Sequence, residues 1–168
     1  MTRPTPAARG PASAALPRWL GPVNRVIVLL QRLGIAFLSF HLLSVPGRRT
    51  GRLRTTPVSP FSVEGRRYIV SFGRTEWVKN ARAAGWGILA RGRRRQRVRL
   101  LALGLDERRP ILRQFPVQVP AGVRFFVQLG AVQPPADPDA FAGAAPGLAV
   151  FRVEPLDAQT PPESRVRR

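Results

Sequence analysis

The sequence predicts a single, mainly β domain folded as a small barrel of mostly antiparallel strands. Strand-like apolar runs follow one another through short glycine- and proline-containing turns, which is typical of hairpin connections. Helix-like segments are short and do not alternate regularly with the strands, as they would in a doubly wound sheet. The 168 residues, 44% of them apolar, provide enough material for one modest core.

Both ends of the chain are expected to lie outside this domain. Residues 1–17 are rich in Pro, Ala and Arg without a hydrophobic period, which predicts a disordered basic arm. The domain is expected to occupy residues 18–156, and residues 157–168 form a polar, basic tail. The arm lacks the order of charged, apolar and cleavage regions that defines a signal peptide.

The first elements of the domain are predicted to be a helix and then a strand. Pro22 suits the first turn of a helix over 22–33, and Gly34 ends it. Residues 26–45 approach the length of a membrane span, but charged and polar residues interrupt them. A helix that covers the barrel or lies on a surface is therefore favoured over a transmembrane helix, and a strand follows at 37–45.

The middle of the chain predicts two strands joined by a hairpin, and then a helix. The strands span 53–61 and 66–72, with a tight turn at Glu64 and Gly65. Pro57 and Pro60 place the first strand at an edge or a bulge. A short helix is expected over 75–85, where Thr75 is a candidate cap and Gly85 a stop signal.

The remaining segments predict two more strands, a helical insert and a final strand. The strands are expected at 86–92 and 93–105, a helix at 106–115, and the last strand at 147–155. Residues 121–130 are ambiguous, and a loop is predicted over 133–146. Arginines occupy positions 91, 93, 95, 97 and 99, so a strand would direct them to one face. That face is either a solvated outer surface or a second anion-binding surface.

Composition excludes several classes of site. The chain has no cysteine, so disulfides and thiolate metal sites are impossible. With a single histidine, zinc enzymes and Ser-His-Asp hydrolases are disfavoured, and no metal is expected. Its net charge of +19 attracts phosphates, anionic lipid headgroups and nucleic acid. Because the basic residues are spread along the whole chain, charge alone does not indicate a nucleic-acid partner.

The strongest candidate site is the turn in "VPGRRTGRLRTTPV", residues 45–58, which contains four arginines between Gly47 and Arg54. Its glycines permit positive φ, so backbone N–H groups can converge on an anion. Arg49 and Arg54 could hold a phosphate with a threonine hydroxyl beside them. The alternative is a charged hairpin tip without a ligand. A second candidate is the pair Trp77 and Asn80, which share a helix face, although such a tryptophan also suits core packing.

Together with "SFGRTEWVKNARAAG" (71–85) and "VFRVEP" (150–155), this turn resembles the deazaflavin-dependent nitroreductases, also described as quinone reductases, which use coenzyme F420. The resemblance covers roughly residues 20–155. It implies a split β-barrel related to flavin-binding barrels, in which the basic turn holds the phosphate and acidic tail of the cofactor. The implied cofactor-binding residues are Arg48, Arg49, Thr50, Arg54, Thr55, Thr56, Pro57, Val70, Ser71, Phe72, Gly73, Trp77, Val78, Lys79 and Asn80.

The resemblance implies a cytoplasmic oxidoreductase that transfers hydride from reduced F420 to a quinone-like, nitroaromatic or other conjugated small molecule. Tyr68 is the only tyrosine, whereas the best-known relatives have a tyrosine cluster in the late helical insert, so no catalytic residue is assigned. The alternative function is a non-catalytic protein that binds the cofactor or an anionic surface, including peripheral contact with the inner face of the plasma membrane. The oligomeric state is left open.

Overall fold

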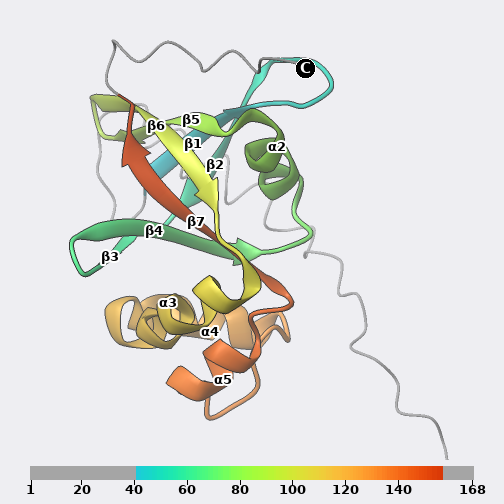
Figure 1. Cartoon of the computed structure of the whole chain (residues 1–168), viewed down its shortest axis with the longest axis vertical. Helices are drawn as coiled ribbons and strands as arrows, with labels where there is room; N and C mark the ends of the chain where they lie inside the picture. The colour runs from blue at the N-terminus through green and yellow to red at the C-terminus, as the bar shows by residue number, and fades with distance from the viewer. Residues whose placement is uncertain (1–40, 157–168) are drawn as a thin grey trace, which may run out of the picture.

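The computed structural model describes residues 41–156, which form seven strands and four helices (Figure 1). The strands are β1 (His41–Pro46), β2 (Leu53–Val58), β3 (Phe61–Val63), β4 (Arg66–Phe72), β5 (Trp86–Arg91), β6 (Arg94–Ala102) and β7 (Leu148–Pro155). The helices are α2 (Glu76–Ala84), α3 (Leu105–Gln118), α4 (Pro120–Gln128) and α5 (Pro138–Gly143).

The seven strands form one sheet in the order β2-β1-β5-β6-β7-β4-β3, and every neighbouring pair is antiparallel. Strands β2 and β3 are the two edges of this sheet, yet only residues 59 and 60 connect them. So short a connection spans roughly 10 Å at most. The two edges must therefore return close to each other, and the sheet curls into the predicted mainly β split barrel.

Two apolar clusters lie on opposite faces of the curled sheet. The inner cluster includes Leu43, Ile69 and Phe151, and α2 covers it with Val78 and Ala81. The outer cluster joins the other face of β3, β4 and β7 to the helical insert formed by α3, α4 and α5, which Figure 1 shows together on one side of the sheet. Alternation along the strands sends successive side chains to the two clusters.

Helix α3 is tied to the sheet by the partly buried side chain of Arg108. Its Nε donates to the backbone oxygen of Leu103, and its Nη1 donates to that of Leu148, both at 2.9 Å. Burial lowers the pKa of Arg108, and the nearby positive charge of Arg82 lowers it further. The guanidinium therefore joins the ends of β6 and β7 to the helical insert.

The predicted strand over 53–61 is wrong as a single element. It divides into β2 and β3, and only β3 pairs with β4 across the turn at Glu64 and Gly65, both of which have positive φ. Strand β2 pairs with β1 at the other edge instead. Proline lacks a backbone N–H, so Pro57 is tolerated in this edge strand, as predicted, and Pro60 lies in the break between β2 and β3.

Within residues 41–156, the predicted helices at 75–85 and 106–115 are confirmed in type and differ at their ends. Gly85 ends α2 with φ of 69°, and its N–H donates to the backbone oxygen of Ala81. Thr75 precedes α2 as predicted, but its hydroxyl donates to the backbone oxygen of Phe72 instead of capping the helix. The ambiguous segment 121–130 is largely helical, because α4 begins one residue earlier, at Pro120, and ends at Gln128.

The predicted loop over 133–146 is also wrong, because it contains α5. The carboxylate of Asp137 accepts a hydrogen bond from the backbone N–H of Ala140 at 2.8 Å, and Pro138 occupies the first turn. Both features are helix start signals.

The alternating arginines are divided between two strands and a turn. Three of them, Arg95, Arg97 and Arg99, lie on β6 and are exposed. The alternating residues Val98 and Leu100 face the inner cluster. Arg91 ends β5 and Arg93 lies in the turn, so the prediction that all five share one strand face is wrong.

Several predictions fall outside the described residues. These are the arm at 1–17, the helix at 22–33, the start of the strand at 37–45 and the tail at 157–168. Within residues 41–156, none of the helices has the length and apolar character needed to cross a membrane.

Candidate anion-binding site

The arginine-rich turn connects β1 to β2 and closes through backbone hydrogen bonds. The N–H of Gly47 donates to the oxygen of Arg52 at 2.9 Å, and the N–H of Gly51 donates to the oxygen of Gly47 at 2.7 Å. Gly51 has φ of +67°, a left-handed conformation that favours glycine. The glycine spacing therefore gives the turn a defined backbone shape.

Gly47 also allows two polar side chains to approach the start of the turn. A Cβ at this buried position would lie 3.2 Å from Thr50 Oγ1 and 3.4 Å from Arg54 Nε. It would also lie 3.3 Å from the backbone oxygen of Arg52. A side chain here would crowd these three atoms, whereas glycine leaves the Thr50 hydroxyl and the Arg54 guanidinium close together. We call this arrangement the cradle.

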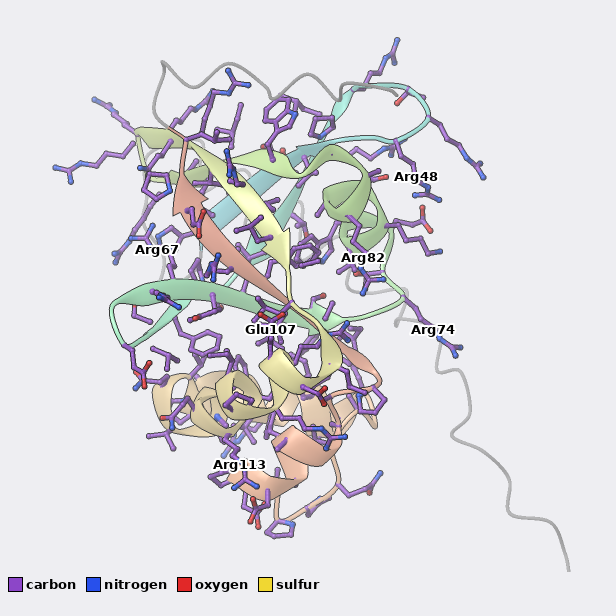
Figure 2. All side chains as sticks on the ribbon, viewed as in Figure 1. Arg48, Arg67, Arg74, Arg82, Glu107 and Arg113 are labelled. Atoms are coloured by element: carbon purple, nitrogen blue, oxygen red, sulfur yellow. The ribbon has the colours of Figure 1, made fainter. Side chains whose placement is uncertain are left out.

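Helix α2 holds the turn through Asn80 and Arg48. The buried Asn80 Oδ1 accepts from the backbone N–H of Arg48 at 3.2 Å and from Arg48 Nη1 at 3.1 Å. Arg48 Nη1 also donates to Glu76 Oε2 at 2.8 Å, and Arg48 lies beside α2 in Figure 2. The side chain of Arg48 is thus engaged by the helix, and the turn is positioned against α2.

Glu76 is the anionic member of this connection. A hydrogen bond from Lys79 Nζ, and then one from Arg48, lower the pKa of Glu76 from 4.5 to about 2. Its carboxylate therefore stays ionised at neutral pH. Because Arg48 and Lys79 share this carboxylate, their positive charges are partly neutralised, unlike those of the other arginines of the turn.

The remaining arginines of the turn are exposed to solvent. Within residues 41–156, Arg49, Arg52 and Arg54 form no ion pair with a carboxylate. Guanidinium groups pair with phosphate and carboxylate oxygens in a fixed bidentate geometry. Together with the cradle at Gly47, they give the turn the donors and charge of an anion site.

The strand after the turn continues the polar surface. Ser44 Oγ and Thr55 Oγ1 lie 2.8 Å apart across the β1–β2 pair. Arg54 and Thr56 alternate with Thr55 and Pro57 along β2, so the two pairs face opposite sides of the edge strand. The structure thus brings Thr55 to Ser44, a residue that the sequence alone did not single out.

The other residues of α2 have different environments. Trp77 is half-buried, and its ring centroid lies 5.6 Å from that of Phe151 in the core. Val78 is completely buried, so its side chain belongs to the core. Lys79 is exposed and bonded to Glu76. Of this predicted group, Asn80 contacts the turn directly.

The end of β4 contributes to both faces of the sheet. Val70 and Phe72 pack against the helical insert, where the ring of Phe72 stacks 5.1 Å from that of Phe126. The buried Ser71 alternates with them and therefore faces the inner side with Ile69. Gly73 donates its N–H to the oxygen of Gly147 at 2.9 Å, which fixes the start of the connection to α2.

The sequence did not identify Glu76 or Gly47 as parts of this arrangement in their observed roles. Glu76 is the first residue of α2, yet its carboxylate accepts a hydrogen bond from Arg48, 28 positions earlier in the chain. One local signal was present, because Glu76 and Asn80 are four residues apart and so share a helix face. The turn that they contact could not be located by helix periodicity.

Comparison with a family model gives a match over residues 31–126, more than half of the chain, and the model describes F420H(2)-dependent quinone reductases. The match includes the turn, β4, α2 and much of the helical insert. None of the curated proteins matches the chain.

Comparison with solved structures gives matches at low sequence identity, among them one with a TM-score above 0.5. A domain-swapped dimer has a TM-score of 0.51 and 16% identity, over 81% of this chain and 97% of the other. An F420-H2 dependent reductase (FDR-A) has a TM-score of 0.43 and 16% identity, over 70% and 95% of the two chains. An FMN-binding protein from Nostoc punctiforme PCC 73102 has a TM-score of 0.49 and 12% identity, over 84% of this chain and 82% of the other.

The present chain spans 64% of the length of another structural match, a protein of unknown function from Agrobacterium tumefaciens str. C58. That match has a TM-score of 0.48 and 15% identity over 94% of the present chain.

Proposed function

The chain belongs to the F420H(2)-dependent quinone reductase family, and on that premise we propose that it is a cytoplasmic oxidoreductase that uses reduced F420. Its acceptor is a quinone-like, nitroaromatic or other conjugated small molecule. The observation that carries this proposal is the basic turn, held against α2 by Asn80 and Glu76 with three arginines exposed beside it.

The residues of the turn fit the acidic tail of such a cofactor. The cradle at Gly47 places the Thr50 hydroxyl and Arg54 Nε near one point, and Arg49 adds a second guanidinium from the same turn. These groups would hold the phosphate and the carboxylates by charge-assisted hydrogen bonds. Arg48 would act through its backbone position, because its side chain is already bonded to α2.

The ring system of the cofactor would lie beside β2, the end of β4 and α2. In this arrangement Thr55, Thr56 and Pro57 line the groove after the turn, while Ser71 lies at the end of β4 and Gly73 directly after it. Trp77, Lys79 and Asn80 complete the helix side, and Val78 contributes backbone only. Val70 and Phe72 support β4 from the helical insert.

When bound, reduced F420 supplies the hydride. The protein then has to bind and orient the cofactor and the acceptor, and to exclude water. None of these tasks requires a nucleophilic side chain. No metal is needed for this chemistry. The basic turn serves it by fixing the anionic tail, which orients the rest of the cofactor relative to the acceptor.

Binding and turnover are tested in two experiments with the full chain. Oxidised F420 should bind with a dissociation constant at or below tens of micromolar in a fluorescence titration, and absence of binding there would overturn the proposal. Reduced F420 should then be oxidised when a panel of quinones and nitroaromatics is added. Binding without turnover over the whole panel would favour the alternative, a non-catalytic cofactor-binding protein.

A further inference from the structure

A second positively charged site lies where strands β4 and β7 separate. The last paired residues of these two strands are Arg67 and Val153. Beyond them, Glu154 and Pro155 pair only with β6. The divergence opens a hollow of about 360 Å³, whose polar lining includes Ser62, Arg66, Arg67, Gln96, Arg152 and Glu154. We call this hollow the fork.

The fork contains more positive charge than its own carboxylate can balance. Its lining contains three arginines, Arg66, Arg67 and Arg152, and one acidic residue, Glu154. That carboxylate pairs with Arg152 at 2.8 Å. Within residues 41–156, Arg66 and Arg67 have no ion-pair partner. The fork is therefore lined by two arginines without an ion-pair partner, whose side chains leave β4 on opposite faces of the strand.

Arg152 supplies a donor that its own partner does not satisfy. Its Nε is buried, and although it lies 2.8 Å from Glu154 Oε1, the two groups are not aligned as a hydrogen bond. A buried donor without an aligned acceptor is costly. The amide of Gln96 and the hydroxyl of Ser62 add neutral polar groups to the lining, which could bind the rest of a ligand.

The fork is separate from the arginine-rich turn. Arg67 and Arg48 lie far apart, on the left and the right of the view in Figure 2, and the lining of the fork includes no residue of the turn. A ligand in the fork therefore would not compete directly with one held by Gly47–Arg54.

We propose that the fork binds the phosphate group of a small molecule, at a site independent of the cofactor. A tetrahedral phosphate presents several oxygens to guanidinium groups that approach it from different sides, which a single planar carboxylate cannot do equally well. The hollow is also larger than one phosphate requires, so there is room for the organic part of a phosphate ester.

The test is a titration of the full-length, 15N-labelled protein followed by NMR. Gly65 lines the fork and Gly51 lies in the turn, so their backbone amides report the two sites separately. The probes are orthophosphate, ribose 5-phosphate and citrate. A saturable shift of the Gly65 amide with either phosphate probe, and a much weaker one with citrate, is the expected result. Tighter binding of ribose 5-phosphate than of orthophosphate would assign the fork to an ester, and equal binding would assign it to free phosphate.

Substitutions test whether each charged side chain of the fork strengthens or weakens phosphate binding. Arg66→Gln and Arg67→Gln should each weaken binding roughly tenfold, because each removes a charge-assisted contact. Glu154→Gln should tighten it, since the competing carboxylate is lost. Arg124→Gln, on α4 and outside the fork, is the matched control and should leave binding unchanged, and thermal unfolding verifies that all variants fold.

Three results would overturn the proposal. One is a Gly65 amide that does not respond to either phosphate probe up to about 10 mM, a concentration well above the range of specific sites. Another is wild-type affinity in both arginine variants. The third is a response confined to Gly51, which would assign phosphate to the turn alone.

Discussion

The side-chain oxygen of Asn80 accepts the backbone N–H of Arg48 at 3.2 Å, and so it joins α2 to a turn 32 positions earlier in the chain. The same oxygen accepts Arg48 Nη1 at 3.1 Å. One buried amide therefore fixes both the backbone and the side chain at the start of the basic turn. The position of the exposed arginines depends on this contact.

Asn80→Ala should release the turn and weaken the binding of oxidised F420 roughly tenfold, because hydrogen bonds that involve a charged group contribute about 1.5–3 kcal/mol. Asn80→Asp keeps the acceptor oxygen next to Arg48 and should retain most of the affinity. A fluorescence titration measures both variants. Equal affinities of Asn80→Ala and the wild type would show that the cofactor does not depend on this connection.

Arg49→Ala and Arg54→Ala should each raise the dissociation constant of F420 about tenfold or more, through loss of a charge-assisted hydrogen bond. Arg52→Ala is the control from the same turn and should have a smaller effect. Affinity should also fall as salt rises, because salt screens exposed charges.

A shortened cofactor without phosphate and glutamate provides the complementary measurement for the turn. It should bind weakly to the wild type and respond little to the three arginine substitutions. Should all three variants bind the complete cofactor like the wild type, the turn would be a charged hairpin tip without a ligand.

Glu76 predicts an acid-dependent loss of stability. Its pKa is lowered from 4.5 to about 2 by Lys79 and Arg48, so its contribution is complete above pH 4.5 and disappears as the pH falls from 4.5 to about 2. The carboxylate is exposed, so the effect should be small. Thermal unfolding of Glu76→Gln should show a shallower decline over this interval than the wild type, and identical slopes would contradict the assigned pKa.

Trp77→Ala should lower the free energy of unfolding by about 2–4 kcal/mol, a little less than complete truncation of a fully buried aromatic. The reason is its packing against Phe151 and the inner cluster. Trp77→Phe keeps a ring at this position and should recover most of the loss. Denaturant unfolding measures both variants. Unchanged stability in Trp77→Ala would mean that the ring serves the ligand groove and contributes little to the core.

Local signals in the sequence predicted most of the strands and α2. The left-handed glycine at Gly85 and the turn at Glu64 and Gly65 were identified because each requires only its immediate neighbours. The start of α5 carried equally local signals in Asp137 and Pro138, but the surrounding Pro- and Ala-rich composition favoured a loop.

These local signals do not predict which strands pair when they are far apart in the sequence. The predicted hairpin between 53–61 and 66–72 placed β2 beside β4, whereas β2 pairs with β1 at the opposite edge. Alternation and turn chemistry are the same in both arrangements, so only the packing of the whole sheet decides between them. The bond from Arg48 to Glu76 likewise depends on how α2 lies against β1, and the family resemblance named Arg48 without indicating that its charge is already shared.

The position of β7 has a consequence for the synthesis of this protein. The strand formed by residues 148–155 lies between β6 and β4, and it joins two parts of the sheet that are not otherwise adjacent. A nascent chain that still lacks these residues has two strands with unpaired inner edges, which are prone to pair with other chains. Completion of the barrel therefore follows emergence of β7 from the ribosome, and a chain truncated before Leu148 should aggregate instead of forming a smaller barrel.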